Sequence, residues 1–258
     1  GDVYKRQLLD KLEPGKHVWG GVQHTSELVR VMEAASLVRR QQGLVSGLDD
    51  ATAENILKPG HLAEWHRTLE TGAMASRGTT HISVADAEGS LASLTLSNGE
   101  GSAYVIPGTG IMLNNMLGEE DLNPDGFHRM PPAVRLASMM TPAIVRYADG
   151  RQVALGSGGS NRIRSAILQV LTNLLEFDMQ LERAVHAPRL HLEGRQLNME
   201  AGFSDAAMQS LEEQWPGAKL WEGTNLFFGG VHAVERLSNG KFRAAGDPRR
   251  GGAIAIAN

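Results

Sequence analysis

The chain has 258 residues, 41% of them hydrophobic and 21% charged, and this composition is that of a folded globular protein rather than a disordered one. Its formal net charge of −4 provides no basic excess for binding nucleic acid. It has no cysteine, which excludes disulfides, thiolate catalysis and zinc–thiolate sites, and no apolar run approaches the ~18 residues that a membrane-spanning helix needs.

The first seven residues, GDVYKRQ, begin without Met and contain no secretory apolar segment. They resemble a translated sequencing adapter. We therefore expect residues 1–7 to be a non-native scar and the true N-terminus to be missing. A natural segment trimmed by processing is the alternative.

Residues 8–78 are predicted to be mostly helical. A first helix is capped by Ser26 and ends near Gly43, because its apolar residues recur at helical spacing. Two shorter helices and a small, polar linker follow, at about 50–57, 61–70 and 71–78.

The pattern changes from helical to alternating after Gly78. The runs THISVAD (80–86) and SLASLTLS (90–97) predict a β-hairpin over residues 79–97. Residues 98–135 are rich in Gly, Pro and Asn. A loop region of that length inside a compact domain is usually functional.

The rest of the chain alternates between hairpins and helices. The predicted elements are hairpins at 143–155 and 189–200, helices at 160–177, about 180–187 and 204–214, and strands at about 226–236 and 241–245. Hairpins with helices grouped between them predict an α+β fold in which antiparallel sheets are covered by helices.

A glycine-rich stretch, LGSGGS at 155–160, leads into the helix predicted at 160–177. Backbone N–H groups converge at such a turn and suit an anion or an oxyanion. The spacing is neither that of a P-loop nor that of a dinucleotide-binding fingerprint. In isolation, the default interpretation of this stretch is a tight strand-to-helix turn.

The nine histidines do not form a metal-binding motif. His61 and His66 are five residues apart, as are His186 and His191, and that spacing does not place either pair on one helical face. We therefore predict no metal site and no cofactor.

The junction RGTTH at 77–81 places a Gly–Thr bond where the linker meets a strand. A threonine that becomes N-terminal by cleavage there gains a free α-amine, which can serve as the base for its own hydroxyl. The alternative is that Thr79 and Thr80 are simply two β-formers at the start of a strand.

Six motifs in order resemble the small subunit of γ-glutamyltranspeptidases. They are TTHISVADAEG (79–89), GTGIMLNN (108–115), LASMMTP (136–142), GSGGSNRI (156–163), APR (187–189) and GDPR (246–249). Residues 8–78 resemble the end of the family's large subunit, most of which lies outside this sequence.

The resemblance implies an N-terminal-nucleophile hydrolase, an αββα sandwich made as a proenzyme that cuts itself. Cleavage would fall between Gly78 and Thr79, and Thr79 would be the nucleophile. Gly158 and Gly159 match the pair whose N–H groups build the family's oxyanion hole. Ser97 matches a Thr that hydrogen-bonds the nucleophile.

The resemblance also implies a binding site for the γ-glutamyl head group. Asn98 and Glu119 match residues that contact the α-amino acid head, and Ser138 matches one that holds the α-carboxylate. Three residues depart from the family pattern: Met116 replaces a Glu or Gln, Ala137 replaces a Ser, and Glu119 replaces an Asp. A thioether cannot replace the lost polar contact at 116, and Glu119 is one methylene longer than the family's Asp.

The implied domains are a linker-bearing end of the large subunit at 8–78 and a small, catalytic subunit at 79–258. The implied function is γ-glutamyl transfer to an amine or to water, with the large subunit as partner, in a periplasmic or extracellular location. This chain alone is expected to be inactive. The alternatives are a related amide acylase of the cephalosporin-acylase type and an inert, proenzyme-like binding protein.

Overall fold

The computed structural model describes residues 12–41, 79–99, 101–119, 122–123 and 126–257. The helices in this part of the chain are α2 (Val22–Gln41), α5 (Arg162–Leu175), α6 (Leu181–His186) and α7 (Asp205–Gln214). The strands are β1 (Thr79–Ala85), β2 (Leu91–Ser97), β3 (Ala143–Arg146), β4 (Gln152–Gly158), β5 (Leu190–Glu193), β6 (Gln196–Glu200), β7 (Lys219–Trp221), β8 (Gly230–Arg236) and β9 (Phe242–Ala245).

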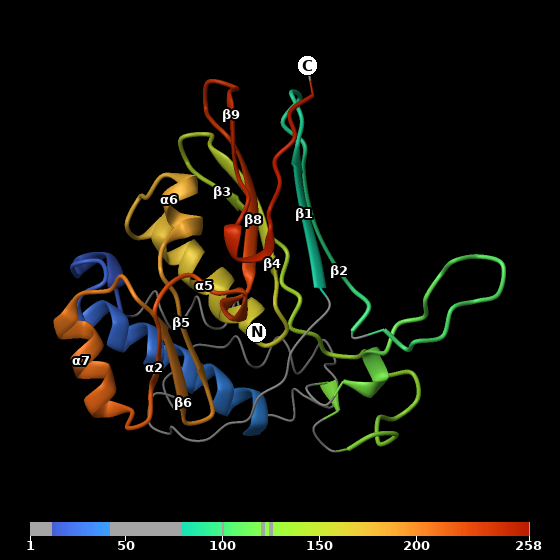
Figure 1. The fold of residues 1–258 in the computed structure, drawn as a ribbon. Helices are drawn as coiled ribbons and strands as arrows, with labels where there is room; N and C mark the ends of the chain where they lie inside the picture. The colour runs from blue at the N-terminus through green and yellow to red at the C-terminus, as the bar shows by residue number, and fades with distance from the viewer. Residues whose placement is uncertain (1–11, 42–78, 100, 120–121, 124–125, 258) are drawn as a thin grey trace.

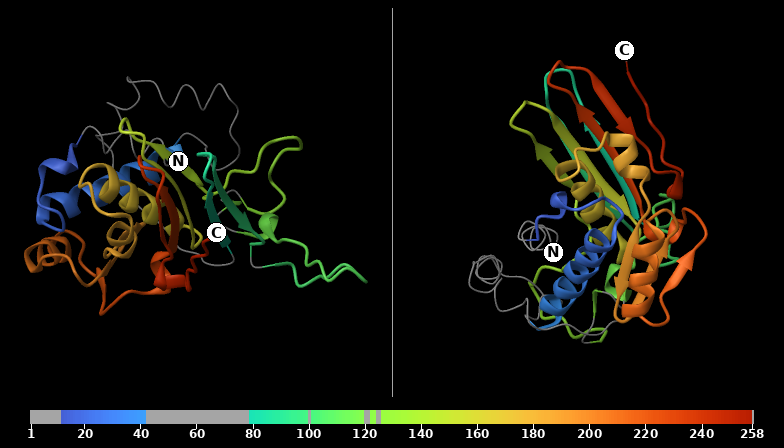
Figure 2. Two further views of the ribbon diagram at one scale, coloured as in Figure 1. Left: turned by 90° about the horizontal axis from the view of Figure 1, so that it is seen from above. Right: turned by 90° about the vertical axis from the view of Figure 1, so that its left-hand side faces the viewer.

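Two β layers and one helical layer build the main body (Figures 1 and 2). The β1–β2 hairpin packs against an antiparallel sheet of order β3-β4-β8-β9, since β1 contacts β4 and β8 and β2 contacts β4. Helices α5 and α6 cover the other face of that sheet, in contact with β4, β8 and β9. The predicted hairpin at 79–97 is thereby confirmed.

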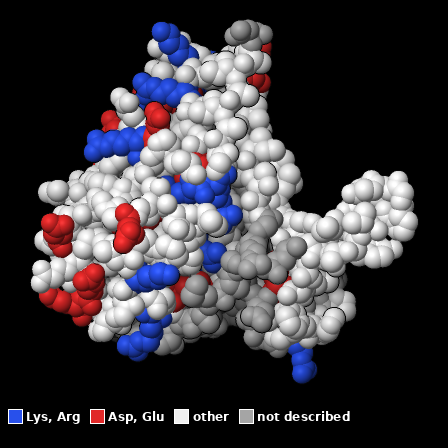
Figure 3. Space-filling model, viewed as in Figure 1, with Lys and Arg blue, Asp and Glu red and all other residues white. Residues whose placement is uncertain are grey.

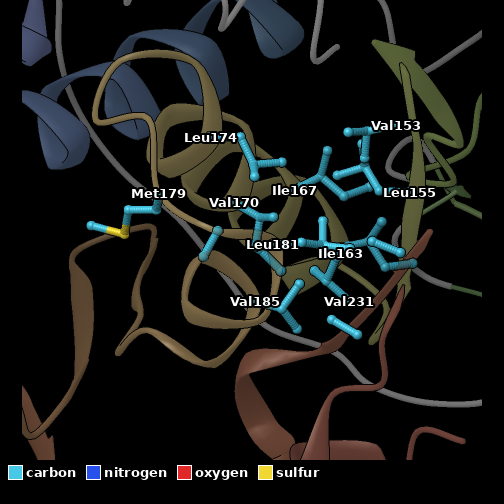
Figure 4. Packing of buried hydrophobic residues seen from close by; sticks show 14 residues of the cluster. Val153, Leu155, Ile163, Ile167, Val170, Leu174, Met179, Leu181, Val185 and Val231 are labelled. Atoms are coloured by element: carbon cyan, nitrogen blue, oxygen red, sulfur yellow. The ribbon is translucent and has the colours of Figure 1, made fainter. Parts of the chain in front are cut away.

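The apolar stripe of α5 forms the core between the helices and the four-stranded sheet (Figure 4). Ile163, Ile167 and Val170 recur at helical spacing, so they share the face that meets Val153 and Leu155 of β4. The helix predicted at 160–177 is confirmed over 162–175.

A second cluster joins α2 and α7 to the sheet of order β5-β6-β7. Leu28 and Met32 of α2 pack with Leu190, Leu197 and Leu211. Strands β5 and β6 form the predicted hairpin, whereas β7 pairs with β6 in parallel. The sheets are therefore not all antiparallel, and the sequence analysis did not predict β7.

Two predicted boundaries in the described residues are wrong. Ser26 is not a cap, because α2 starts four residues earlier and its hydrogen bonds begin at the carbonyl of Gly21. Residues 226–228 form a 3₁₀ turn rather than the start of a strand, since the Asn225 side chain caps the Phe227 N–H. The helices predicted at 50–57 and 61–70 and the linker lie outside the described residues.

Strand β4 also extends through Gly158, whereas the sequence predicted a turn there. Gly156 and Gly158 pair with His232 and Gly230 of β8, so this glycine-rich segment belongs to the sheet. Only the residues after Gly158 form the turn into α5.

Two surfaces of the body are apolar and exposed. The outer face of the β1–β2 hairpin carries Ile82, Val84, Leu94 and Leu96, each about half exposed. Residues 101–115, before the 3₁₀ turn at Met116–Gly118, contain no charged side chain and lie in a loop that projects from the body (Figures 1 and 3). In the described residues, no helix combines the length and the apolar character that crossing a membrane requires.

Candidate active site

The hairpin places Thr79 directly opposite Ser97. The two residues are register partners at the open end of β1–β2, so their side chains lie on the same face of the hairpin. The Thr79 hydroxyl donates to Ser97 Oγ over 3.2 Å, and Ser97 Oγ also accepts from the Gly99 N–H over 3.1 Å. The predicted contact between these two residues is present.

Strand β4 approaches the hairpin closely because two of its residues lack a side chain. A Cβ on Gly158 would lie 2.3 Å from the Thr79 carbonyl oxygen, and a Cβ on Gly156 would lie 2.3 Å from the His81 ring. Glycine is therefore required at both positions for β1 to pack on β4. This packing brings Thr79 next to the start of the turn into α5.

The turn that follows β4 has an unusual backbone. Gly159 has φ 141° and Ser160 has φ 53°, a left-handed conformation that is uncommon for a residue with a side chain. The first bonds of α5 start here, since the carbonyls of Gly159 and Ser160 accept from the N–H groups of Arg162 and Ile163. The turn thus lies at the positive end of a 14-residue helix.

Thr79 and Ser97 line a small cavity together with residues from the loop region and from the start of α5. The other lining residues are Met116, Glu119, Leu122, Ser138, Met139, Met140, Ser160 and Ile163. The cavity has a volume of about 20 Å³, which is room for about one water molecule.

The structure brings most of the predicted site residues together. Glu119 and Ser138 line the cavity with Thr79, although they are 40 and 59 positions away in the chain. Glu119 approaches the hairpin end, since a Cβ on Gly99 would lie 2.8 Å from Glu119 Oε1. Met116, which departs from the family pattern, also lines the cavity.

Gly158 and Gly159 do not line the cavity, and among the residues predicted to bind the head group Asn98 is the one that does not. Its carbonyl accepts from the N–H groups of Gly101 and Asn115, and its side chain lies near Gly101. It therefore fastens the base of the projecting loop next to Ser97. Ala137 is half-buried beside Ser138 and is likewise outside the lining set.

The sequence analysis missed half of the lining residues. Met139 and Met140 belong to a motif that carried the resemblance, and Ser160 follows the glycine pair, so position in a motif was the available signal. Leu122 and Ile163 gave no signal, because their apolar side chains also fit an ordinary core.

His81 is a buried structural residue rather than a base for Thr79. Its Nδ1 and Nε2 each lie 2.8 Å from a hydroxyl oxygen, of Thr95 and Ser83 respectively. Burial, and then the neighbouring His232, lower the pKa of His81 to about 4. The ring is therefore neutral at pH 7, and both its nitrogens are engaged away from the nucleophile.

A buried quartet of charged side chains lies behind the glycine turn. Arg189 donates to Asp247 over 2.6 Å, and Arg249 forms ion pairs with both Asp247 and Glu200. Arg189 also donates to the carbonyl of Gly229, next to Gly159. Burial lowers the pKa of Arg189 to about 10, so this side chain remains protonated at pH 7.

The described residues contain no group of three or more His, Asp or Glu side chains that could hold a metal ion. His186 and His191 have separate partners: His186 contacts the Gly246 carbonyl, and His191 contacts the Ser165 hydroxyl. His61 and His66 are outside the described residues.

The sequence matches the family model described as gamma-glutamyltranspeptidase over residues 23–257. It is 33% identical over 183 residues to the acylase ACY 1 proenzyme of Pseudomonas sp. (strain SE83), which covers 70% of this chain and 32% of that protein. It is 30% identical over 179 residues to the glutathione hydrolase proenzyme of Bacillus subtilis (strain 168), covering 68% of this chain and 30% of the relative. The chain thus spans about a third of the length of these curated relatives.

Solved structures agree with this relationship. The gamma-glutamyltranspeptidase of Pseudomonas nitroreducens, complexed with L-DON, is 26% identical with a TM-score of 0.55, over 69% of this chain and 100% of that one. The cephalosporin acylase of Bacillus halodurans, at 21% identity, shares the fold with a TM-score of 0.65 over 93% of this chain and 44% of the other. The fold is that of N-terminal-nucleophile hydrolases, as predicted, and the chain belongs to the γ-glutamyltranspeptidase family.

Proposed function

We propose that this chain carries the nucleophile of an acyl-transfer enzyme that acts on γ-glutamyl amides, and that its nucleophile is Thr79. The observation that carries the proposal is the position of the Thr79 hydroxyl. It lies opposite Ser97, in the wall of the cavity that also contains Glu119 and Ser138. A hydroxyl alone is a weak nucleophile, and cleavage at Gly78–Thr79 would supply an α-amine to act as its base.

The reaction would run in two steps. Thr79 Oγ attacks the γ-glutamyl carbonyl, its proton passes to the α-amine, and the amine leaving group departs with that proton. The resulting ester is then attacked by water or by an acceptor amine, which releases the γ-glutamyl group and restores Thr79. The N–H groups of Gly158 and Gly159 would stabilise the oxyanion, at the positive end of α5.

The head group would bind in the wall of the same cavity. The Glu119 carboxylate suits the substrate α-amine, the Ser138 hydroxyl suits the α-carboxylate, and Asn98 would hold the loop base beside them. The domain boundary at 78/79 and a large-subunit partner follow from the same cleavage. A periplasmic or extracellular location belongs to this proposal as well.

Amide acylase activity on another acyl group is the second candidate, and Met116 favours it. Met116 lines the cavity where a polar side chain would be needed against the α-amine. The identity of 33% to an acylase proenzyme points the same way. Turnover of a γ-glutamyl anilide against that of a glutaryl amide separates the two candidates.

The test uses the protein expressed from its complete gene and its Thr79→Ala variant. Wild-type protein should separate into two chains on a denaturing gel and hydrolyse the γ-glutamyl anilide, whereas Thr79→Ala should do neither, because one hydroxyl serves both steps. Thr80→Ala, whose side chain is exposed, is the matched control and should retain both. A Thr79→Ala protein that still splits at Gly78 contradicts the proposal, and a wild type that stays as one band favours an inert, proenzyme-like protein.

A further inference from the structure

Four polar side chains connect the end of β5 to the first turns of α5. Asn161 Nδ2 donates to Glu193 Oε1, Glu193 Oε2 lies 3.4 Å from His191 Nε2, and His191 Nδ1 lies 2.7 Å from Ser165 Oγ. Asn161, Ser165 and His191 are each at least nine-tenths buried. This continuous chain of contacts lies outside the residues that line the Thr79 cavity.

Ser165, His191 and Glu193 are connected in the same order as a hydrolytic Ser–His–acid triad, but the serine is too deeply buried to act as a nucleophile. Ser165 is 3% exposed and its hydroxyl lies between His191 and the Arg162 carbonyl, so no substrate reaches it. The cluster can therefore act only by holding the backbone around it.

The protonation state of His191 decides which groups of the cluster donate hydrogen bonds and which accept them. Burial lowers the pKa of His191, although Glu193 opposes the shift. Because a carboxylate only accepts, His191 Nε2 is the donor to Glu193, and the single hydroxyl hydrogen of Ser165 is shared between the Arg162 carbonyl and His191 Nδ1. Glu193 is thus oriented by His191 from one side and can receive Asn161 on its other oxygen.

Asn161 is the link to the glycine turn. It directly follows Ser160 and precedes the first residue of α5, yet its side chain does not cap the helix. Its amide reaches Glu193 instead, and a hydrogen bond to a carboxylate is about twice as strong as one between neutral groups. The residue that ends the turn is therefore held from β5, in a different sheet from β4.

We propose that Glu193 is a positioning residue for acyl transfer: held by His191, it fixes Asn161 and thereby keeps Gly158, at the end of β4, and Gly159, in the turn, aligned with Thr79. The inference rests on the proposed function, because it takes the N–H groups of these two glycines as the oxyanion site. A displacement of about 1 Å at a reacting geometry can reduce rates by about 100-fold without weakening binding.

The test compares Glu193→Ala with Glu235→Ala in the protein expressed from its complete gene. Glu235 is the control: its side chain is 4% exposed, against 11% for Glu193, and is paired with arginines, but it lies opposite Val153, at the end of β4 away from Thr79. With the γ-glutamyl anilide, Glu193→Ala should lower kcat by about 10-fold to 100-fold while KM changes less than about twofold. Glu193→Gln keeps an acceptor for Asn161 and should recover part of the loss. Glu235→Ala should leave both constants near wild type.

Two further measurements show whether Glu193 acts through Asn161. The double variant Asn161→Ala/Glu193→Ala should be no slower than the slower single variant, since both remove the same bond. Amide hydrogen exchange over residues 158–162 should be faster in Glu193→Ala and unchanged in Glu235→Ala. Multiplicative losses of kcat, or unchanged exchange, overturn the inference.

The outcomes separate the two proposals. Inactive wild-type protein overturns the proposed function and the positioning role with it. Active wild-type protein with an unchanged kcat in Glu193→Ala overturns the positioning role alone.

Discussion

Replacing Gly158 by Ala tests the close approach of β4 to the nucleophile. The added Cβ would lie 2.3 Å from the carbonyl oxygen of Thr79 and 3.2 Å from its carbonyl carbon, both of which are backbone atoms. The first of these separations has to open to at least 3.0 Å. Strand β4 cannot move away, because it is paired with β3 on one side and β8 on the other. Thr79, at the start of β1, is the residue that must shift.

The expected effect is larger on activity than on stability. Inserting a carbon into a packed contact costs about 1–3 kcal/mol of unfolding free energy. A shift of the nucleophile by about 0.7 Å is close to the ~1 Å misplacement that lowers turnover by about 100-fold, so a loss of this order is expected. The sequence analysis assigned Gly158 to the oxyanion turn, and the steric contact with Thr79 adds a second reason for the same loss.

The measurements are kcat for a γ-glutamyl anilide and urea unfolding, each on the protein expressed from its complete gene. Gly223→Ala is the matched control, because a Cβ at that position meets nothing within 4 Å. It should keep wild-type turnover and stability within about 0.5 kcal/mol. Wild-type turnover in Gly158→Ala would refute the steric reasoning, since it would mean that Thr79 tolerates displacement.

The other predictions concern pH, the buried charges and specificity. Below pH 6.5 His81 becomes protonated in the unfolded chain, whereas in the folded protein its pKa of about 4 keeps it neutral. The free energy of unfolding should therefore fall by up to about 3 kcal/mol between pH 6.5 and pH 4, and His81→Gln should reduce that fall in urea titrations; equal pH dependence in both proteins contradicts this. Asp247→Asn leaves Arg189 without its charged partner and should lower the unfolding free energy by about 3–5 kcal/mol in the same assay, so a loss below about 1 kcal/mol would count against the buried quartet. Met116→Gln combined with Ala137→Ser should lower KM for a γ-glutamyl donor, because each restored charge-assisted hydrogen bond contributes about 1.5–3 kcal/mol; an unchanged or higher KM favours the acylase.

Local periodicity was enough to predict most of the elements. Residues 163, 167 and 170 repeat with the helical period, and their burial against β4 follows from it. Alternation in 79–97 predicted the hairpin in the same way. Periodicity fails to predict an element that only tertiary contacts determine. An example is β7, whose three residues pair with β6 although two of them are exposed.

The candidate site could be predicted only in part, for a related reason. Thr79 and Ser97 are neighbours across one hairpin, so their contact follows from register alone. Glu119 and Ser138 come from a loop region without periodicity, and the resemblance alone suggested that they share a site. Glycine in a strand has no sequence signature that separates it from glycine in a turn, and the stretch to Gly158 was accordingly predicted as a turn although it is strand.

The late motifs of the chain show how residues far from the cavity bear on it. Arg189 and Asp247 are 58 positions apart and form a fully buried ion pair, and Arg249 joins Asp247 to Glu200. Four buried charges carry a large desolvation cost, which is offset only when each is paired and hydrogen-bonded. The Arg189 guanidinium also donates to the carbonyl of Gly229. Gly229 packs against the turn, since a Cβ on Gly159 would lie only 2.7 Å from the Gly229 Cα. The quartet therefore holds the Gly229 backbone, against which Gly159 of the turn packs.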